Sequence, residues 1–409
     1  MTGRYPHRNG GEGFYHLRKS DVPILPALLR GGGYAVGLLG KLEHSTPYAD
    51  FQWDVALDKQ DLGMGRNPDV YARCARRFME ESIASGKPFF LMLNSHDPHR
   101  PFFGNDKEHW YDQTRTSPAA RPPSRRFVPE EIRPPGFLPD LPEVRLELSE
   151  YYSSVKRCDD TVGAAMEVLD ELEVADKTLV IFLSDNGMAF PFAKTNCYLH
   201  STRTPWIVRW PEKVNAGRVE SRQFVSGIDL MPTVLDVAGL PIPDGVDGQS
   251  FLPVLDGAVQ AGRERVFTQF HQTAGRRNYP MRCIQDRRFG YIFNPWSDGA
   301  RVFINESQAG RTMAAMKEAA EQDADLAARV HLFLYRVPEE LYDFQNDPHA
   351  LVNLVEDPRY ADVLQRLRLA LDEYMERTQD PALECFRHRD DPACCQAYLK
   401  EMGAELGTR

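Results

Sequence analysis

Three short apolar runs, each ending abruptly in polar residues, most constrain what this chain can fold into. They are GYAVGLLGKLEH (33–44), PFFLMLNSHDPH (88–99) and KTLVIFLSDNG (177–187), and a helix-like stretch precedes each run. Continuous apolar runs between turn residues are typical of strands that are buried on both faces, as in a parallel sheet covered by helices. We therefore predict an α/β fold with a mostly parallel sheet.

The sequence pattern changes near Asp256, and this change predicts a second, smaller part of the chain. Strand-like pieces such as RVFTQF and RRFGYIFN follow it, then an acidic helical stretch and a final helix from Asp357 to Gln379. We predict an α/β domain over 1–256 and a C-terminal subdomain over 257–409 with a small antiparallel sheet. Within the first part we predict a helix over 147–172, a Pro-rich surface loop over 115–142, and a strand running into a helix in FVSGIDLMPTVLDVAGL.

Composition excludes some partners and leaves others open. The net charge of -10 provides no general attraction to nucleic acid or anionic membranes, so an anionic substrate needs local positive charge. The sequence has no apolar run of about eighteen residues, so we expect no membrane span.

None of the seven cysteines has zinc-ligand spacing. Cys394 and Cys395 are adjacent, which leaves at most a disulfide near the C-terminus, and the redox compartment stays open.

The residues that follow the three runs predict a functional site. Ligands of open α/β sheets bind at the carboxyl ends of the strands. The runs end in Lys41 with His44, in His96-Asp97-Pro98-His99, and in Asp185-Asn186. Carboxylate and amide oxygens suit calcium or magnesium rather than zinc. Taken singly, each group has a plainer explanation, namely a turn, a solvated lysine or a structural histidine, and only their joint placement favours a site.

Several longer motifs, in order along the chain, resemble type I sulfatases of the alkaline phosphatase superfamily. They include MTGRYPHRNG, GGGYAVGLLGK, NSHDPHRPF, YYSSVKRCDDTVG, STRTPWIVRWP and DGVDGQSFLPVL. SDNGMAFPFAKTN, NYPMR and ELYDFQNDPHALVNLVEDPRY are similar to the heparan N-sulfatase branch. The resemblance implies an alkaline-phosphatase-like fold. It also implies a hydrolase that acts on sulfate esters or N-sulfate (sulfamate) groups of a sulfated sugar or glycan.

The same resemblance implies four catalytic residues. Lys41 and Lys194 would bind the sulfate oxygens, where their charge stabilises the transition state. His44 would orient the nucleophile, although the family usually has G-K-x-H where this chain has one more residue, in Gly40-Lys41-Leu42-Glu43-His44. His99 would act as general acid toward the leaving nitrogen or oxygen.

Metal-binding and substrate-binding residues are also implied. Asp185 and Asn186 would be two ligands of a Ca²⁺ ion, with Mg²⁺ as the alternative, that polarises the sulfate. Asp97 would recognise the amine side of the sugar. Arg282 would reach the substrate pocket, and a structural ion pair is its alternative role.

The family nucleophile is a formylglycine made from a cysteine in C-x-P-S-R, and none of the seven cysteines has that context. We expect translation to start upstream of Met1, in a segment that carries this cysteine and an Asp-Asp pair for the metal. Two alternatives remain: a non-catalytic protein that binds sulfated glycans, and a phosphonate or phosphate ester hydrolase of the same superfamily. Family analogy places the protein in the periplasm or outside the cell, and a homodimer is left open.

Overall fold

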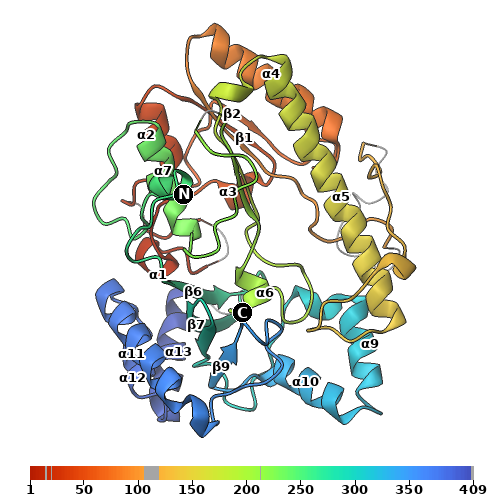
Figure 1. The fold of residues 1–409 in the computed structure, drawn as a ribbon, viewed down its shortest axis with the longest axis vertical. Helices are drawn as coiled ribbons and strands as arrows, with labels where there is room; N and C mark the ends of the chain where they lie inside the picture. Colours follow the sequence, from red (N-terminus) through yellow and green to blue (C-terminus); the bar gives the residue numbers. More distant parts are fainter. Residues whose placement is uncertain (14–15, 20, 106–118, 212, 407–409) are drawn as a thin grey trace.

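A three-stranded parallel sheet forms the centre of the N-terminal part (Figure 1). The computed structural model describes residues 1–13, 16–19, 21–105, 119–211 and 213–406. The strand order is β2 (Val55–Leu57), β1 (Ala35–Leu39), β3 (Phe89–Leu93), with Gly37 level with Val55 on one side and with Leu91 on the other. All five residues of β1 are buried, as the apolar run predicts for a strand with neighbours on both sides.

Helices cover both faces of this sheet, which confirms the predicted α/β class. On one face, α4 (Pro68–Ala84) and α5 (Pro142–Glu171) contribute Tyr71, Phe78 and Leu169 to a cluster that includes Leu39. On the other face, α2 (Leu25–Gly31) and α7 (Leu230–Val237) pack around Val36. The predicted helix over 147–172 is confirmed as part of α5.

The third apolar run behaves differently from the prediction. It forms β4 (Val180–Leu183), which pairs antiparallel with β5 (Trp206–Arg209), and this pair is a sheet of its own among the described residues. Its side chains are half-buried or exposed, unlike those of β1. The physical reason is that an apolar run specifies burial on its faces but does not specify which strand will supply the hydrogen bonds along its edges.

Of two local predictions, the strand at 224–226 is wrong and the Pro-rich loop lies partly outside the described residues. The segment 224–226, expected as a strand, precedes a 3₁₀ turn at Gly227–Asp229 and then α7. Of the predicted Pro-rich loop, residues 115–118 lie outside the described residues. The remainder up to 141 contains one 3₁₀ turn, Pro129–Glu131, and agrees with a surface loop.

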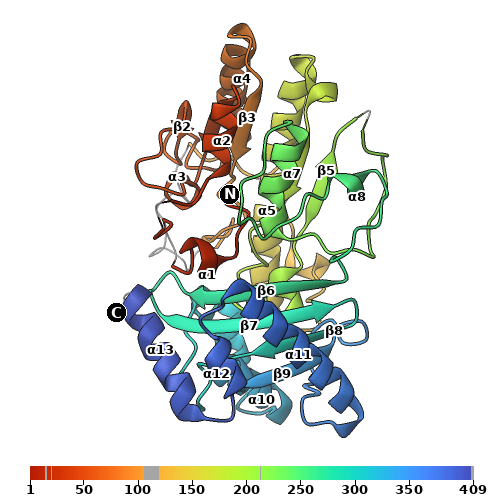
Figure 2. The same cartoon turned by 90° about the vertical axis from the view of Figure 1, so that its left-hand side faces the viewer.

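The smaller antiparallel sheet is confirmed. Its four strands lie in chain order as β6 (Arg265–Gln272), β7 (Asn278–Asp286), β8 (Phe289–Phe293) and β9 (Glu339–Asp343). This sheet lies below the N-terminal elements in both views of the molecule (Figures 1 and 2). On one side it packs against α11 (Ala361–Thr378), through residues such as Leu367 and Leu371.

Helices complete the C-terminal part. Before β9 come α9 (Arg311–Ala319) and α10 (Ala324–Tyr335), and after α11 come α12 (Leu383–Arg387) and α13 (Pro392–Leu406). The predicted helix over 357–379 is therefore not the last one.

One hydrophobic cluster joins the two parts of the chain. It contains Phe102, Leu148 and Phe190 from the first part together with Tyr279 and Phe333 from the second. The two parts therefore share a core, and the boundary near residue 256 stays a prediction. None of the helices in the described ranges is long and apolar enough to cross a membrane.

Candidate functional site

A tight turn at the end of β1 positions the first predicted pair, Lys41 and His44. Gly40 has φ 80°, and a Cβ there would collide with the carbonyl oxygen of Asn94 and approach the Tyr71 hydroxyl. Lys41 itself has φ 52°, a left-handed conformation that costs a non-glycine residue about 1 kcal/mol or more and is concentrated at functional sites. The short helix α3 (Leu42–Ser45) follows and carries the exposed His44.

At the end of β3, Asp97 does not face solvent. Its two carboxylate oxygens accept hydrogen bonds from Arg157 Nε (2.6 Å) and Nη2 (2.9 Å), and Arg66 Nη1 lies 3.7 Å away. The Asp97 side chain is 0% exposed. The geometry thus gives Asp97 a buried ion pair with Arg157, and its contact with a sugar amine stays a prediction.

His99 and Lys194 come together around one carboxylate that the sequence reasoning missed. Lys194 Nζ donates to Glu306 Oε2 at 2.6 Å, and His99 Nε2 lies 3.8 Å from Glu306 Oε1. Glu306 stands at the start of a 3₁₀ turn, Glu306–Ala309, in the C-terminal part. It is 112 residues from Lys194, and no local motif in INES signals the contact.

The hydrogen bonds of His99 determine which ring nitrogen can act on a substrate. Nδ1 lies 2.9 Å from the carbonyl oxygen of Arg100. A carbonyl only accepts, so Nδ1 carries the proton and Nε2 faces Glu306. The predicted general acid therefore presents Nε2 on the side of the Lys194–Glu306 pair.

Burial and charge shift the pKa values of this cluster in a consistent way. Burial, with the Lys194 charge as the next cause, lowers the pKa of His99 from 6.5 to about 4, while Glu306 opposes the shift. Burial raises the pKa of Glu306, but the Lys194 charge and then His99 outweigh it, so the pKa stays below the usual value. At neutral pH the cluster thus contains a neutral imidazole and an ionised ion pair.

Replacing Glu306 with glutamine is expected to lower the pKa of His99 still further, because the carboxylate that favours the imidazolium is removed while Lys194 remains. The imidazole pKa is measured by NMR titration of the His99 ring protons. Glu318→Gln, which changes an exposed carboxylate on α9, is the control. An unchanged or higher pKa of His99 in Glu306→Gln would contradict the arrangement.

The same depressed pKa predicts how pH changes stability. The folded-state pKa of His99 lies below 6.5. The contribution of His99 to the free energy of unfolding is therefore fully present above pH 6.5 and is lost as pH falls toward about 4. His96, whose pKa burial and then Lys41 also lower to about 4, contributes in the same window.

Electrostatic interactions place Lys41, His44 and Asp185 in one region. Although His44 is exposed by its accessible surface, partial desolvation of the ring lowers its pKa; the Lys41 charge adds to this shift, whereas Glu43 and Asp185 oppose it. Lys41 also lowers the pKa of His99. The charges that follow β1 and β4 therefore act on His44, and the Lys41 charge also acts on His99 after β3, although β4 belongs to a separate sheet.

The predicted metal ligands follow β4. Asp185 is exposed and Asn186 is half-buried, and the Ser184 hydroxyl donates to the Asn186 carbonyl at 2.8 Å. Gly187 is required next, because a Cβ there would collide with the carbonyls of His200 and Ala193. These oxygens suit a hard cation, which takes about six to eight oxygen ligands when it is calcium. Across the described residues, no group of three or more His, Cys, Asp or Glu side chains is placed to hold a metal ion, and the ligand roles of Asp185 and Asn186 stay a prediction.

Arg282 lies on β7 and is held by an acidic partner. Its Nε and Nη2 donate to the two oxygens of Asp380 at 2.5 and 2.8 Å, and His7 Nδ1 lies 3.8 Å from the same carboxylate. The side chains of Arg282 and Asp380 are 1% and 0% exposed. The ion pair, which the sequence left open as the alternative role, is present, and it buries the guanidinium that a substrate would have to reach.

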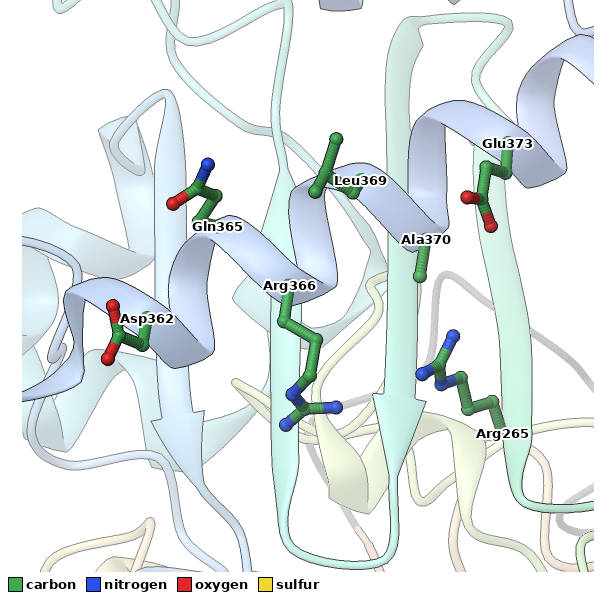
Figure 3. A pocket seen from close by; sticks show the side chains of 7 residues that line it. All are labelled: Arg265, Asp362, Gln365, Arg366, Leu369, Ala370 and Glu373. Atoms are coloured by element: carbon green, nitrogen blue, oxygen red, sulfur yellow. The ribbon is translucent and has the colours of Figure 1, made fainter.

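A surface hollow elsewhere does not contain any of the predicted site residues. Figure 3 shows it between α11 and β6, and its lining comprises Arg265, Asp362, Gln365, Arg366, Leu369, Ala370 and Glu373. Arg366 is already paired with Asp286 at 2.9 Å. Its charges are mixed and the hollow is open, so it lacks the convergent polar groups of a ligand site.

The Sulfatase family matches residues 1–240, and the family "N-sulphoglucosamine sulphohydrolase, C-terminal" matches residues 189–298. The chain is 31% identical to human N-sulphoglucosamine sulphohydrolase, over 93% of this chain and 80% of that protein. It is 27% identical to an ulvan-active sulfatase of Formosa agariphila, over 90% of this chain and 67% of that protein.

Solved structures show the same fold at lower identity. One is a protein in complex with its substrate D-glucosamine-2-N,6-O-disulfate, with a TM-score of 0.66 and 17% identity over 93% of this chain and 87% of that chain. Another is a phosphonate monoester hydrolase of Agrobacterium radiobacter, with a TM-score of 0.63 and 20% identity over 92% of this chain and 84% of that chain. These likenesses confirm the alkaline-phosphatase-like architecture.

Proposed function

Because this chain belongs to the sulfatase family, we propose that it acts on sulfate esters or N-sulfate groups of a sulfated amino sugar within a glycan. The family is one of hydrolases, and the C-terminal match and the human relative lie in the N-sulphoglucosamine branch. An N-sulfated glucosamine unit is therefore the first substrate to test.

The convergence of Lys194 and His99 on the Glu306 carboxylate supports this proposal best. The site already binds one anion through the Lys194 ammonium, 15% exposed, at 2.6 Å. A sulfate group presents the same kind of oxygen acceptor to the ammonium, and a half-buried ammonium interacts more strongly with an anion than a solvated one. Substrate binding would move Lys194 from Glu306 to the sulfate oxygens.

The movement of Lys194 from Glu306 to the sulfate would also prepare His99 for proton transfer. Its pKa is low because the half-buried imidazole is partly desolvated and Lys194 lies near. A bound sulfate adds a negative charge beside the ring and raises the pKa of His99, so the imidazolium becomes available when substrate is present. We propose that His99 Nε2 then donates a proton to the leaving nitrogen or oxygen, that Lys41 joins Lys194 on the sulfate oxygens, and that His44 orients the nucleophile.

Calcium and formylglycine are proposed from the family. Asp185 and Asn186 would be two of the metal ligands, and a bound calcium ion would polarise the sulfate. Within the 409 residues, no cysteine stands in a C-x-P-S-R context. The site residues within this sequence can therefore contribute anion binding and proton transfer.

Replacing Lys194 with methionine is expected to weaken binding of glucosamine N-sulfate roughly 10- to 100-fold, because a charge-assisted hydrogen bond contributes about 1.5–3 kcal/mol. Calorimetric titration of the purified chain measures the dissociation constant. Lys87→Met, which removes an exposed lysine before β3, is the control and should bind as the parent does. Equal affinities for the two variants would contradict the assignment of Lys194.

Turnover separates the proposed function from its alternatives. The protein isolated from the cell that makes it is assayed with glucosamine N-sulfate, an aryl sulfate, an aryl phosphate and a phosphonate monoester. Faster turnover of the sulfated substrates supports the proposal. Preference for the phosphorus esters would favour the superfamily alternative, and binding of sulfated sugar without turnover would favour a glycan-binding protein. We also propose an exported location, by family analogy.

A further inference from the structure

Two cysteines meet at the corner between α12 and α13. The Sγ atoms of Cys385 and Cys395 lie 2.8 Å apart, and both residues are buried. The neighbouring Cys394 is only half-buried, and its Sγ lies 3.7 Å from the carbonyl oxygen of Glu384. The corner therefore contains one buried thiol pair with a third, more accessible thiol beside it.

The thiol pair is part of the core that holds the last helices onto the antiparallel sheet. Both cysteines belong to a cluster with Phe386 of α12, Tyr398 of α13 and Tyr291 of β8. The chain around residues 385 and 395 is thus held together by packing before any covalent bond forms. Packing of this kind supplies the proximity that a covalent bond between the two sulfurs needs.

We propose that Cys385 and Cys395 are an oxidation site, at which the two thiols close to a disulfide that links α12 to α13. A disulfide has an S–S length of about 2.05 Å, so the sulfurs need to move by less than about 1 Å. The proposal specifies the disulfide near the C-terminus that the sequence left open: it joins Cys385 to Cys395, and the adjacent Cys394 stays a thiol.

The chemistry balances with a disulfide as the oxidant, such as oxidised glutathione. One cysteine thiolate of the pair attacks a sulfur of the oxidant, which forms a mixed disulfide and releases one thiol. The second cysteine thiolate attacks the protein sulfur of that mixed disulfide, forms the Cys385–Cys395 bond and releases the second thiol. Two electrons pass from the cysteines to the oxidant, and the two cysteine protons end on the released thiols.

The surroundings of the pair determine how it reacts. Burial raises the pKa of the Cys395 thiol, and burial together with the neighbouring Cys395 raises the pKa of Cys385. Few thiolates are therefore present at neutral pH and exchange is slow. Formation of the disulfide also requires oxidising surroundings. Such an environment is found outside the cytosol, so the site also bears on the exported location proposed above.

Mass spectrometry of the purified 409-residue chain tests the proposal. After incubation with oxidised glutathione, the intact protein should be about 2 Da lighter than after dithiothreitol, and peptide mapping should find Cys385 joined to Cys395. The oxidised form should also melt a few degrees higher, because a short loop is closed in the unfolded chain. Cys394→Ser is the matched control and should show the same link and the same shift.

Two results would overturn the proposal. One is that Cys385 and Cys395 both remain open to alkylation in the unfolded, oxidised protein. The other is that the mapped link involves Cys394 in place of Cys395. Cys395→Ser should lose the melting shift, and if that variant fails to fold, the map of the parent chain decides the matter alone.

Discussion

Replacing Asp97 with alanine is expected to lower the free energy of unfolding by about 3–5 kcal/mol, because it leaves the buried Arg157 guanidinium without its counter-charge. Arg157 is 4% exposed and donates two hydrogen bonds to Asp97, so water cannot replace the lost carboxylate. The pair also joins the end of β3 to α5, the helix that covers the parallel sheet. Urea unfolding followed by circular dichroism measures the change.

The control for Asp97→Ala is a substitution at Asp159, which lies two residues from Arg157 on the same helix. Lys156 and Asp159 form an ion pair at 2.6 Å, with Asp159 68% exposed, so Asp159→Ala should cost less than about 1 kcal/mol. The double variant Asp97→Ala with Arg157→Ala should be less destabilised than the sum of the two single variants. A loss below about 1 kcal/mol for Asp97→Ala, together with weaker binding of glucosamine N-sulfate, would support the substrate contact that the sequence predicted.

Replacing Arg282 with methionine is expected to have a similarly large effect, about 3–5 kcal/mol, since methionine fills much of the volume but leaves Asp380 buried and uncompensated. Asp380 is 0% exposed; burial raises its pKa, but the charge and hydrogen bonds of Arg282 outweigh burial and the pKa is lowered to about 2. Because this depressed pKa is stabilising above the unfolded value of 3.8, the contribution is present at neutral pH and is lost as pH falls toward about 2. The variant should therefore lose stability at pH 7 and much less of it near pH 2.

Arg288 on the same hairpin is the control for Arg282. It pairs with Asp343 at 2.7 Å but is 47% exposed, so Arg288→Met should cost less than about 1 kcal/mol. Binding of glucosamine N-sulfate by Arg282→Met, measured at a temperature where the variant is folded, should match that of the parent. Full stability combined with weaker binding would instead place Arg282 in the substrate pocket.

The amino-acid pattern alone predicted most of the architecture. Residues 35–39 and 89–93 are continuous apolar runs, and they form neighbouring parallel strands, β1 and β3. The long helix α5 and the antiparallel C-terminal sheet also follow from local periodicity. β4 was placed wrongly because apolar burial does not specify which strand edge it will pair with, and no local signal distinguishes its antiparallel partner β5.

The sequence by itself determined which residue types stand at the strand ends, and so it predicted Lys41, His99 and Asp185 as a group, whereas Lys194 was implied by the family resemblance. Only the tertiary structure decided what each of them touches. Glu306 reaches Lys194 across 112 residues of sequence, and Asp97 and Arg282 find Arg157 and Asp380 across 60 and 98 residues. Such pairs depend on how distant segments pack around a shared core, and that packing leaves no periodic trace in the residues on either side.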